Sequence, residues 1–220
     1  MEELLERLAY CVEFGKINLA SPYPPDMRGQ EGADELTKKA LDMGIPPTDV
    51  LNKGLVVGMG KVGVKFRENK VFVPQVLMSA KAMSFGMAHL KPYFNDGSVV
   101  RKGKMVIGTV EGDLHDIGKN LVAMMVEGSG WEVIDLGTDV KAERFVEAIK
   151  ANPGAVIGLS ALLTTTMVNM EKIVKAVKDA APGTIVAIGG APVTQNFSDK
   201  IGADVYSPDP QGMIDYLKKF

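Results

Sequence analysis

The sequence predicts an α/β protein: a flavodoxin-like (Rossmann-type) five-stranded parallel sheet preceded by an all-α four-helix bundle. Two observations predict it. Over residues 1–93, apolar side chains recur at helical spacing between proline-rich breaks. Over residues 105–220, short and almost continuous apolar runs alternate with helical segments, which is typical of parallel strands buried on both faces. We therefore expect a helical domain at 1–93, a linker at 94–104 and an α/β domain at 105–220.

Four helices are predicted in the first half. They are expected over residues 2–18, 33–43, about 48–66 and 74–91. The breaks between them are Ser21–Pro25, Ile45–Thr48 and Arg67–Lys70. Pro92 is expected to end the fourth helix, because proline removes a backbone donor and collides with the preceding turn. Four helices with short connections imply a small antiparallel bundle.

Five strands are predicted in the second half, each about six residues long and followed by a helix. They are expected at residues 105–110, 131–136, 155–160, 184–189 and 204–207. The first of the helices is expected at about Lys119–Glu127 and the last at Met213–Lys219. In sheets of this kind, ligands bind outside the carboxyl ends of the strands, where the strand order reverses. The functional site is therefore expected at that edge.

The composition argues against binding to nucleic acid or to a membrane. The net charge is −2 without a long basic run, and no apolar run reaches the ~18–20 residues that cross a bilayer. The acidic N-terminus is unlike a signal peptide, and the single cysteine suits a reducing cytoplasm, so a cytoplasmic location is expected. Two histidines and one cysteine disfavour a zinc site built from protein ligands alone. A metal held mainly by an organic macrocycle would need only one of them.

The most informative segment is Asp113-Leu114-His115-Asp116-Ile117-Gly118, between the first predicted strand and the next helix. Ser160-x-Leu162 follows Gly118 after 41 intervening residues, and Gly189-Gly190 follows Leu162 after another 26. The three elements fall at the carboxyl ends of the first, third and fourth strands. In the flavodoxin-like order the loops after these strands are neighbours, so the elements are expected to converge on one crevice.

These elements resemble the signature of cobalamin-binding (corrinoid) proteins. The resemblance implies that His115 is the lower axial ligand of cobalt. Asp113 would bind the second ring nitrogen of His115 and fix its tautomer, as carboxylates do behind metal-ligating histidines. Thr166 stands where methionine synthase, which this region resembles, has a serine, so an Asp113–His115–Thr166 relay is expected.

The resemblance also implies that the benzimidazole arm of the cofactor leaves cobalt and enters a slot in the sheet, the base-off/His-on state. Ser160 and Thr164 would offer hydroxyls there, Leu162 an apolar wall, and Gly189-Gly190 a backbone that a flat ring can approach closely. The remaining expected cofactor contacts are Gly112, Leu114, Asp116, Ile117, Gly118 and Pro210. Gly118 is also expected to permit tight packing of the helix on the strand.

The helical half resembles the cap that precedes the cobalamin domain in methionine synthase and in the stand-alone corrinoid proteins of methanogens and acetogens. The matching stretch extends from Gly63 to Met83. Family residues that cover the upper face of cobalt correspond to Phe66, Val73 and Val76. The alternative for these three is an ordinary place in the core of the bundle.

Because the resemblance covers nearly the whole chain, no segment is left for a catalytic domain that activates a substrate. The implied function is a corrinoid protein that carries a methyl group on cobalt, with methylcobalamin or a related corrinoid as cofactor. A substrate-specific methyltransferase would supply the methyl group, and an acceptor methyltransferase would pass it to tetrahydrofolate or coenzyme M. A reductive activation protein is the third implied partner. The sequence does not disclose the methyl donor.

Two other functions share the signature and stay open. One is a cobalamin-dependent sensor or regulatory module, which normally needs an output domain; the chain has no basic helix–turn–helix candidate. The other is the small subunit of an adenosylcobalamin mutase, which usually lacks the helical cap. A receiver domain of the same fold is disfavoured, because Ser160 stands where its phospho-acceptor aspartate would be.

Overall fold

The computed structural model describes residues 2–220 and divides them into two compact units. The division falls between Arg101 and Lys102, inside the segment expected as the linker. Residues 96–103, between the last helix of the first unit and the first strand of the second, form neither helix nor strand. Within the described residues no helix combines the length and the apolar character needed to cross a membrane.

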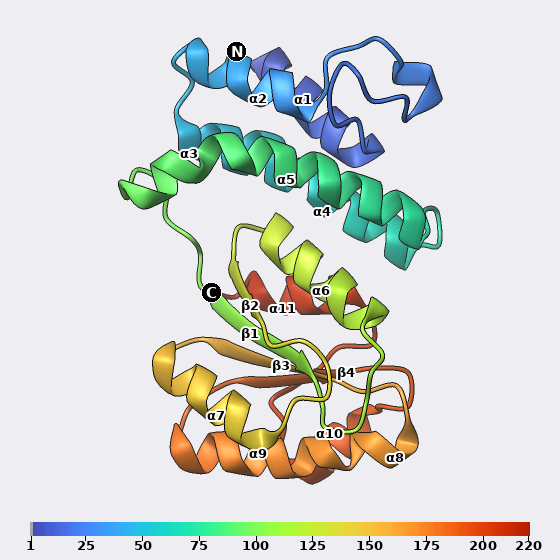
Figure 1. The fold of residues 1–220 in the computed structure, drawn as a ribbon, viewed down its shortest axis with the longest axis vertical. Coiled ribbons are helices and arrows are strands. Elements are labelled where there is room, and N and C mark those ends of the chain that lie inside the picture. Colours follow the sequence, from blue (N-terminus) through green and yellow to red (C-terminus); the bar gives the residue numbers. More distant parts are fainter. Residues whose placement is uncertain (1) are drawn as a thin grey trace. The chain divides into compact units, whose positions relative to one another are not determined.

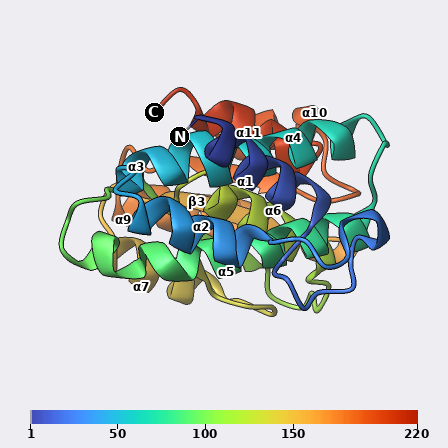
Figure 2. The same ribbon diagram turned by 90° about the horizontal axis from the view of Figure 1, so that it is seen from above.

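The first unit is built from helices. Its elements are α1 (Glu2–Phe14), the 3₁₀ turn η1 (Pro25–Met27), α2 (Ala33–Asp42), α3 (Pro47–Asp49), the π-helical segment η2 (Val50–Leu55), α4 (Val56–Arg67) and α5 (Val73–Asn95). Helix α1 packs against α2, α4 and α5, and α2 packs against α5 (Figures 1 and 2). Since α3, η2 and α4 follow one another without a break, they form the third predicted helix. The prediction of a four-helix cap is confirmed.

Helix α1 ends at Phe14, earlier than the predicted end at Asn18. The cause is Gly15, which adopts a left-handed φ of +72°. The next N–H, that of Lys16, then turns back to the carbonyl of Cys11 across 2.8 Å. Glycine is the residue that takes this conformation at a helix end without steric cost. The predicted end was wrong because Gly15, and not the later break at Ser21, ends the helix.

Helix α5 continues past Pro92 to Asn95, so the expectation that Pro92 ends it was wrong. The proline lies in the last turn, where Asp96 N–H still donates to its carbonyl across 3.1 Å. The carbonyl of Ala88 loses its helical donor, but Ala88 and Pro92 are both exposed, so water can replace that donor. An exposed proline near a helix end is therefore tolerated.

The second unit is a parallel sheet in the order β2-β1-β3-β4-β5. Its strands are β1 (Lys104–Thr109), β2 (Glu132–Asp135), β3 (Val156–Ser160), β4 (Val186–Gly189) and β5 (Val205–Tyr206). Its helices are α6 (Ile117–Gly128), α7 (Ala142–Ala151), α8 (Thr164–Met167), α9 (Asn169–Ala180), α10 (Gln195–Ile201) and α11 (Pro210–Leu217). Figure 1 shows α6 and α11 on one face of the sheet, and α7, α9 and α10 on the other. The predicted flavodoxin-like fold is confirmed.

The strand order reverses at β1, which has β2 on one side and β3 on the other. At the carboxyl edge, Thr109 at the end of β1 pairs with Ser160 at the end of β3. Ser160 pairs in turn with Gly189 at the end of β4. The three signature elements therefore leave the sheet side by side, as the strand order predicts.

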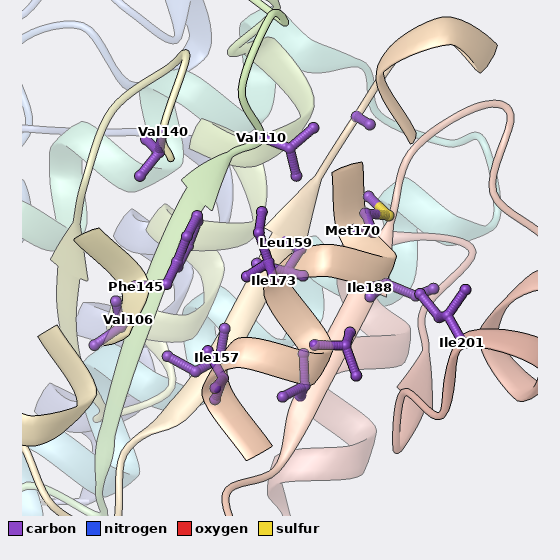
Figure 3. Close-up of a cluster of buried hydrophobic side chains, with 14 of the residues drawn as sticks. Val106, Val110, Val140, Phe145, Ile157, Leu159, Met170, Ile173, Ile188 and Ile201 are labelled. Carbon is purple, nitrogen blue, oxygen red and sulfur yellow. The ribbon is translucent and has the colours of Figure 1, made fainter. Parts of the chain in front are cut away.

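A buried apolar cluster supports this edge from one face of the sheet (Figure 3). Val106, Ile157 and Ile188 come from β1, β3 and β4, while Phe145 comes from α7 and Ile173 from α9. Each is at most 1% exposed. Full burial of such side chains stabilises a fold by about 1.5–3 kcal/mol apiece. The loops at the carboxyl edge therefore extend from strands that are held by a well-packed core.

Candidate functional site

The loop between β1 and α6 carries His115 and is tied to the neighbouring strand. The N–H of Val110 donates to the carbonyl of Ser160 across 3.0 Å, which extends the pairing of β1 with β3 by one residue. Thr109, fully buried, donates its hydroxyl to the carbonyl of His115 across 2.9 Å. The histidine side chain itself is 51% exposed. The strand end therefore holds the backbone of a residue whose ring remains accessible.

Asp113 is the centre of the site. Its carboxylate is buried, and Oδ1 accepts the main-chain N–H of His115 at 3.0 Å and lies 2.7 Å from Nδ1 of the same ring. Oδ2 accepts the hydroxyl of Thr166 at 2.7 Å and the N–H of Leu162 at 2.8 Å. The structure thus brings Asp113, His115 and Thr166 into one hydrogen-bonded chain, in which the carboxylate is the middle member.

The pKa of Asp113 lies well below the usual range for an aspartate. Burial by itself would raise the pKa, because it penalises the charged form. The hydrogen bonds donated by Thr166, by the N–H of Leu162 and by His115 stabilise the carboxylate and outweigh that effect. Asp113 is therefore ionised at neutral pH and can only accept hydrogen bonds.

The tautomer of His115 follows from this charge. A carboxylate has no proton to give, so Nδ1 must be the donor in the 2.7 Å contact with Asp113. The lone pair of the neutral ring is then on Nε2, which has no hydrogen-bond partner within residues 2–220. An imidazole with one nitrogen fixed by a carboxylate and the other free is the usual form of a metal-ligating histidine.

The described residues contain no group of three or more His, Cys, Asp or Glu side chains placed to hold a metal ion. His115 could therefore contribute a single bond to a metal whose other ligands come from elsewhere. A metal held mainly by an organic macrocycle would meet that condition, because the macrocycle would supply most of its ligands.

The two glycines at the end of β4, Gly189 and Gly190, lie against the loops that follow the adjacent strands. Gly190 has a φ of +128°, and a Cβ there would fall 1.8 Å from the carbonyl oxygen of Ala161. A Cβ on Gly189 would fall 3.0 Å from the carbonyl oxygen of Ser207, in the loop after β5. Pro210, the first residue of α11, follows Ser207 by three residues. The backbone therefore requires glycine at position 190 whatever binds nearby.

The other predicted contacts surround this edge. Ser160 is half-buried at the end of β3, while Leu162 and Thr164 are exposed just beyond it. Leu114, in the loop after β1, and Ile117, at the start of α6, are 74% and 67% exposed. Further exposed members of the predicted set are Gly112, Asp116 and Gly118. Large apolar side chains that gather unburied around a polar site are a common sign of a binding surface.

One expectation about Gly118 was wrong. It was expected to allow tight packing of α6 on the sheet, but a Cβ at this position would meet no heavy atom within 4 Å. Gly118 is exposed on the same edge as His115. No packing within the chain requires glycine here. Its contact with the cofactor remains a prediction.

The three residues predicted from the helical cap lie in the first unit. Phe66, on α4, and Val73, at the start of α5, are half-buried. Val76 is fully buried, in agreement with the alternative of a core position. Their cover of the upper face of cobalt stays a prediction.

Sequence reasoning missed two residues that hold the His115 loop. Thr109 was treated as part of an apolar strand. A hydroxyl at the end of such a strand can, however, hydrogen-bond to the loop that follows, as that of Thr109 does to the carbonyl of His115. Asp139, after β2, accepts the N–H of Gly112 at 2.7 Å through Oδ1. Since β2 is adjacent to β1 in the expected strand order, a polar residue just after β2 could have been suspected.

Comparison with known proteins agrees with this geometry. A family model described as B12 binding domain matches residues 103–210, and a second model of that description matches residues 29–91. Trimethylamine corrinoid protein 1 of Methanosarcina acetivorans is 42% identical over 193 residues, which cover 86% of this chain and 89% of that protein. Dimethylamine corrinoid protein 1 of the same organism is 45% identical over 221 residues, covering 99% and 97%. The chain belongs to the corrinoid protein family.

A solved structure extends the likeness to the whole fold of this corrinoid protein. A chain in the methanol:cobalamin methyltransferase complex MtaBC from Methanosarcina barkeri is 30% identical, with a TM-score of 0.80. The match covers 99% of this chain and 81% of that one. The predicted family and the predicted cofactor, cobalamin or a related corrinoid with its cobalt, are confirmed. Nε2 of His115 is free, and residues 2–220 contain no cluster of side chains that could hold a metal ion by themselves. Both observations fit a cobalt that is held mainly by its own cofactor.

Proposed function

We propose that this corrinoid protein carries a methyl group from a substrate-specific methyltransferase to an acceptor methyltransferase, which delivers it to tetrahydrofolate or coenzyme M. A reductive activation protein is the third proposed partner. The relatives named for trimethylamine and dimethylamine, and the neighbour from a methanol:cobalamin methyltransferase complex, support this role. The observation that carries the proposal is the chain Thr166–Asp113–His115, which leaves one imidazole nitrogen free for cobalt.

When bound, the corrinoid supplies a cobalt centre that can take up and give away a methyl group. The protein would bind it base-off/His-on, with Nε2 of His115 on the lower side of the ring. Asp113 keeps the proton on Nδ1 and holds the ring in one orientation, while Thr166 fixes the second oxygen of that carboxylate. Whether or not Nε2 held the cobalt, Nδ1 would stay paired with the Asp113 carboxylate, so the ring would keep its orientation.

The slot for the displaced benzimidazole arm would lie at the ends of β3 and β4. The backbone of Gly189 and Gly190 would form its floor. Ser160 and Thr164 would donate or accept hydrogen bonds with the nucleotide, and Leu162 would cover a ring face. The exposed Leu114 and Ile117 would be buried when the corrin binds.

The test uses the fact that the chain has two histidines, His89 and His115. The protein is produced with ¹⁴N- or ¹⁵N-histidine, loaded with cobalamin without oxygen and reduced to the cobalt(II) state. An axial nitrogen from histidine should give a three-line superhyperfine splitting in the EPR spectrum with ¹⁴N and a two-line splitting with ¹⁵N. We expect His115→Ala to remove this isotope-dependent splitting.

His89→Ala is the matched control. His89, on α5, lies 2.6 Å from Oδ1 of Asp34 on α2, so its removal disturbs the helical unit and leaves the β1–α6 loop intact. The isotope-dependent splitting should persist in this variant. Persistence of the splitting in His115→Ala, or its absence in the wild type, would contradict the ligand role. An adenosyl group on the cobalt of purified protein, in place of methyl, would contradict the carrier role.

The methyl-transfer step is tested with loaded wild-type protein reduced further, to cobalt(I), because that state has the electron pair that can take a methyl group from the donor. Loaded wild-type protein is mixed with methanol, dimethylamine or trimethylamine, each together with a methyltransferase specific for it, and methylation of cobalt is followed by absorbance. One donor should be used at least tenfold faster than the others, because the partner enzyme recognises both its substrate and the carrier. Methylation with none of the donor–enzyme pairs would exclude methanol, dimethylamine and trimethylamine as methyl donors through these partners.

A further inference from the structure

A second carboxylate, that of Asp139, holds the loop in which Asp113 lies. Asp139 follows β2 and precedes α7. Its Oδ1 accepts the N–H of Gly112 at 2.7 Å, and its own N–H donates to the carbonyl of Asp113 at 3.0 Å. Asp139 thus binds the N–H of the residue before Asp113 and the carbonyl of Asp113 itself.

Asp139 makes these two bonds from an unusual conformation. Its φ is +55°, and Asn69 is the other non-glycine residue with a positive φ among residues 2–220. A left-handed conformation is strained for an ordinary residue and is easier for Asp and Asn. The next residue, Val140, donates its N–H to the carbonyl of Thr109 at 3.0 Å, which holds the turn against the end of β1. Such conformations persist where the surroundings fix them, and they gather at functional sites.

The loop needs an external restraint because of its own sequence. Gly112, with a φ of +81°, directly precedes Asp113, and glycine has the widest conformational freedom of any residue. The carboxylate of Asp113 must meet Leu162 and Thr166 with one oxygen and the His115 ring with the other. A rotation of the backbone at 112–113 would move both oxygens together and break this arrangement.

We propose that Asp139 is a positioning residue for His115. By fixing the backbone at Gly112 and Asp113, it sets the direction of the Asp113 carboxylate, which in turn sets the tautomer and the orientation of the imidazole. Asp139 acts through Asp113 and need not touch the corrinoid. The inference rests on the proposed function, since the orientation of His115 matters most when Nε2 binds cobalt.

Three substitutions separate the two properties of Asp139. Asp139→Asn keeps an acceptor oxygen and tolerates the left-handed conformation. Asp139→Gly keeps the conformation and removes the acceptor. Asp139→Ala removes the acceptor and disfavours the conformation. We therefore expect the asparagine variant to behave as the wild type, the glycine variant to lose positioning, and the alanine variant to lose positioning and stability together.

The first measurement is made on apo-protein. Two-dimensional ¹H–¹⁵N spectra of ¹⁵N-histidine-labelled protein report which ring nitrogen of His115 carries the proton. Wild type and Asp139→Asn should show the Nδ1–H tautomer alone, and the other two variants a mixture of tautomers. The second measurement is the cobalt(II) EPR splitting, from which the ratio of His-bound to His-free cofactor is obtained. This ratio should fall about tenfold in Asp139→Gly, the lower end of the range for residues behind a metal ligand.

Asp204→Ala is the matched control for stability. Asp204 likewise accepts a backbone N–H, that of Val186 at 2.8 Å, and its other oxygen accepts Nζ of Lys178 at 2.8 Å. Val186 begins β4, so this carboxylate lies at the opposite end of the strands from His115. The control should lower the melting temperature without changing the His115 ring signals or the EPR splitting.

Several results would overturn the inference. Asp139→Gly with a single Nδ1–H tautomer and a wild-type EPR ratio would make Asp139 a purely structural residue. Altered signals in Asp139→Asn would contradict the claim that an acceptor oxygen in the left-handed conformation is sufficient for positioning. If Asp139→Ala does not fold, the comparison of the glycine and asparagine variants still decides. A wild-type protein without histidine splitting would refute the ligand role of His115 alone, because the apo-protein spectra still test the action of Asp139 on the ring.

Discussion

Thr166 donates its buried hydroxyl to Oδ2 of Asp113 across 2.7 Å, joining the segment after β3 to the loop after β1. The hydroxyl is shared, since the same oxygen also lies 3.0 Å from the carbonyl of Leu163. The methyl group of Thr166 would lie 3.6 Å from a Cβ at Gly112, an ordinary van der Waals distance. The side chain of Thr166 therefore fits at this position, and its methyl group is accommodated.

Removal of that hydroxyl should weaken the site. Thr166→Val keeps the shape of the side chain and leaves Oδ2 of Asp113 with fewer donors. Loss of a hydrogen bond to a buried charged group costs about 1.5–3 kcal/mol. We expect the free energy of unfolding of the apo-protein, from urea titration, to fall by about that amount. Thr166→Ser should stay within about 1 kcal/mol of the wild type; equal losses in both variants would mean that packing, and not the hydroxyl, stabilises this position.

The low pKa of Asp113 predicts how stability depends on pH. The folded carboxylate resists protonation, whereas the unfolded one titrates near the ordinary value of about 3.9. Below that pH the unfolded state binds more protons than the folded state, so the stabilisation, complete above it, is lost as pH falls through the folded pKa. The free energy of unfolding should therefore decrease with falling pH below about 4.

Asp113→Asn removes this single titration and serves as the comparison. The difference in slope between wild type and variant should approach about 1.4 kcal/mol per pH unit, the value for one proton, between about pH 4 and pH 2. Urea titrations at several pH values measure both slopes. Parallel slopes for the two proteins would contradict the low pKa of Asp113.

Two glycines at the carboxyl edge should respond in opposite ways to alanine. In Gly190→Ala, the new Cβ collides with the backbone of Ala161, and the φ of +128° is strained for alanine. We expect a loss of more than about 3 kcal/mol of stability, or no folded protein. In Gly118→Ala, the Cβ enters open space and alanine favours the helix, so the apo-protein should be as stable or more stable.

Gly118→Ala also tests whether Gly118 contacts the cofactor. If the corrinoid approaches Gly118, the added methyl group should weaken cobalamin binding by about 1–3 kcal/mol, the usual cost of an extra methyl in a packed contact. Reconstitution of the apo-protein with cobalamin, followed by absorbance, measures this. Unchanged affinity in a stable Gly118→Ala protein would remove Gly118 from the cofactor contacts.

The parts of the fold that were predicted from sequence are those that several independent features of the sequence indicate. Each predicted strand is present within two residues of its expected ends, because five apolar runs and their turns repeat one pattern. The meeting of Asp113 with Thr166 was implied by the family resemblance, and the strand order, which puts the ends of β1 and β3 side by side, makes it possible. Periodicity and topology, which average over many residues, were sufficient for the strands and for their order.

The parts that were not predicted depend on single backbone conformations. Gly15 ends α1 and Asp139 holds Gly112 through left-handed turns, and a sequence pattern does not reveal which residue will take a positive φ. The helix through Pro92 depends on the exposure of Ala88. The open space at Gly118 could not be inferred from the sequence. A glycine at the start of a helix that follows a strand is equally compatible with close packing and with contact to a ligand.

Cys11 offers a probe of the helical unit. It is the one cysteine of the chain, is 1% exposed on α1, and burial raises its pKa to about 11. The thiolate is the reactive form, and at pH 8 a group with that pKa is ionised about one part in a thousand. Since the unfolded thiol is itself about one-tenth ionised at pH 8, we expect native protein to react with Ellman's reagent at least about 10²-fold more slowly than urea-unfolded protein.

The reaction of Cys11 should then report opening of the helices around α1. Its rate at pH 8 is measured over a series of urea concentrations below the unfolding transition. Because the folded thiol is both covered and protonated, labelling must pass through open molecules, and the rate should rise with urea in proportion to their population. Fast labelling of native protein that does not depend on urea would show that Cys11 is accessible without opening, and it would contradict both the burial and the raised pKa.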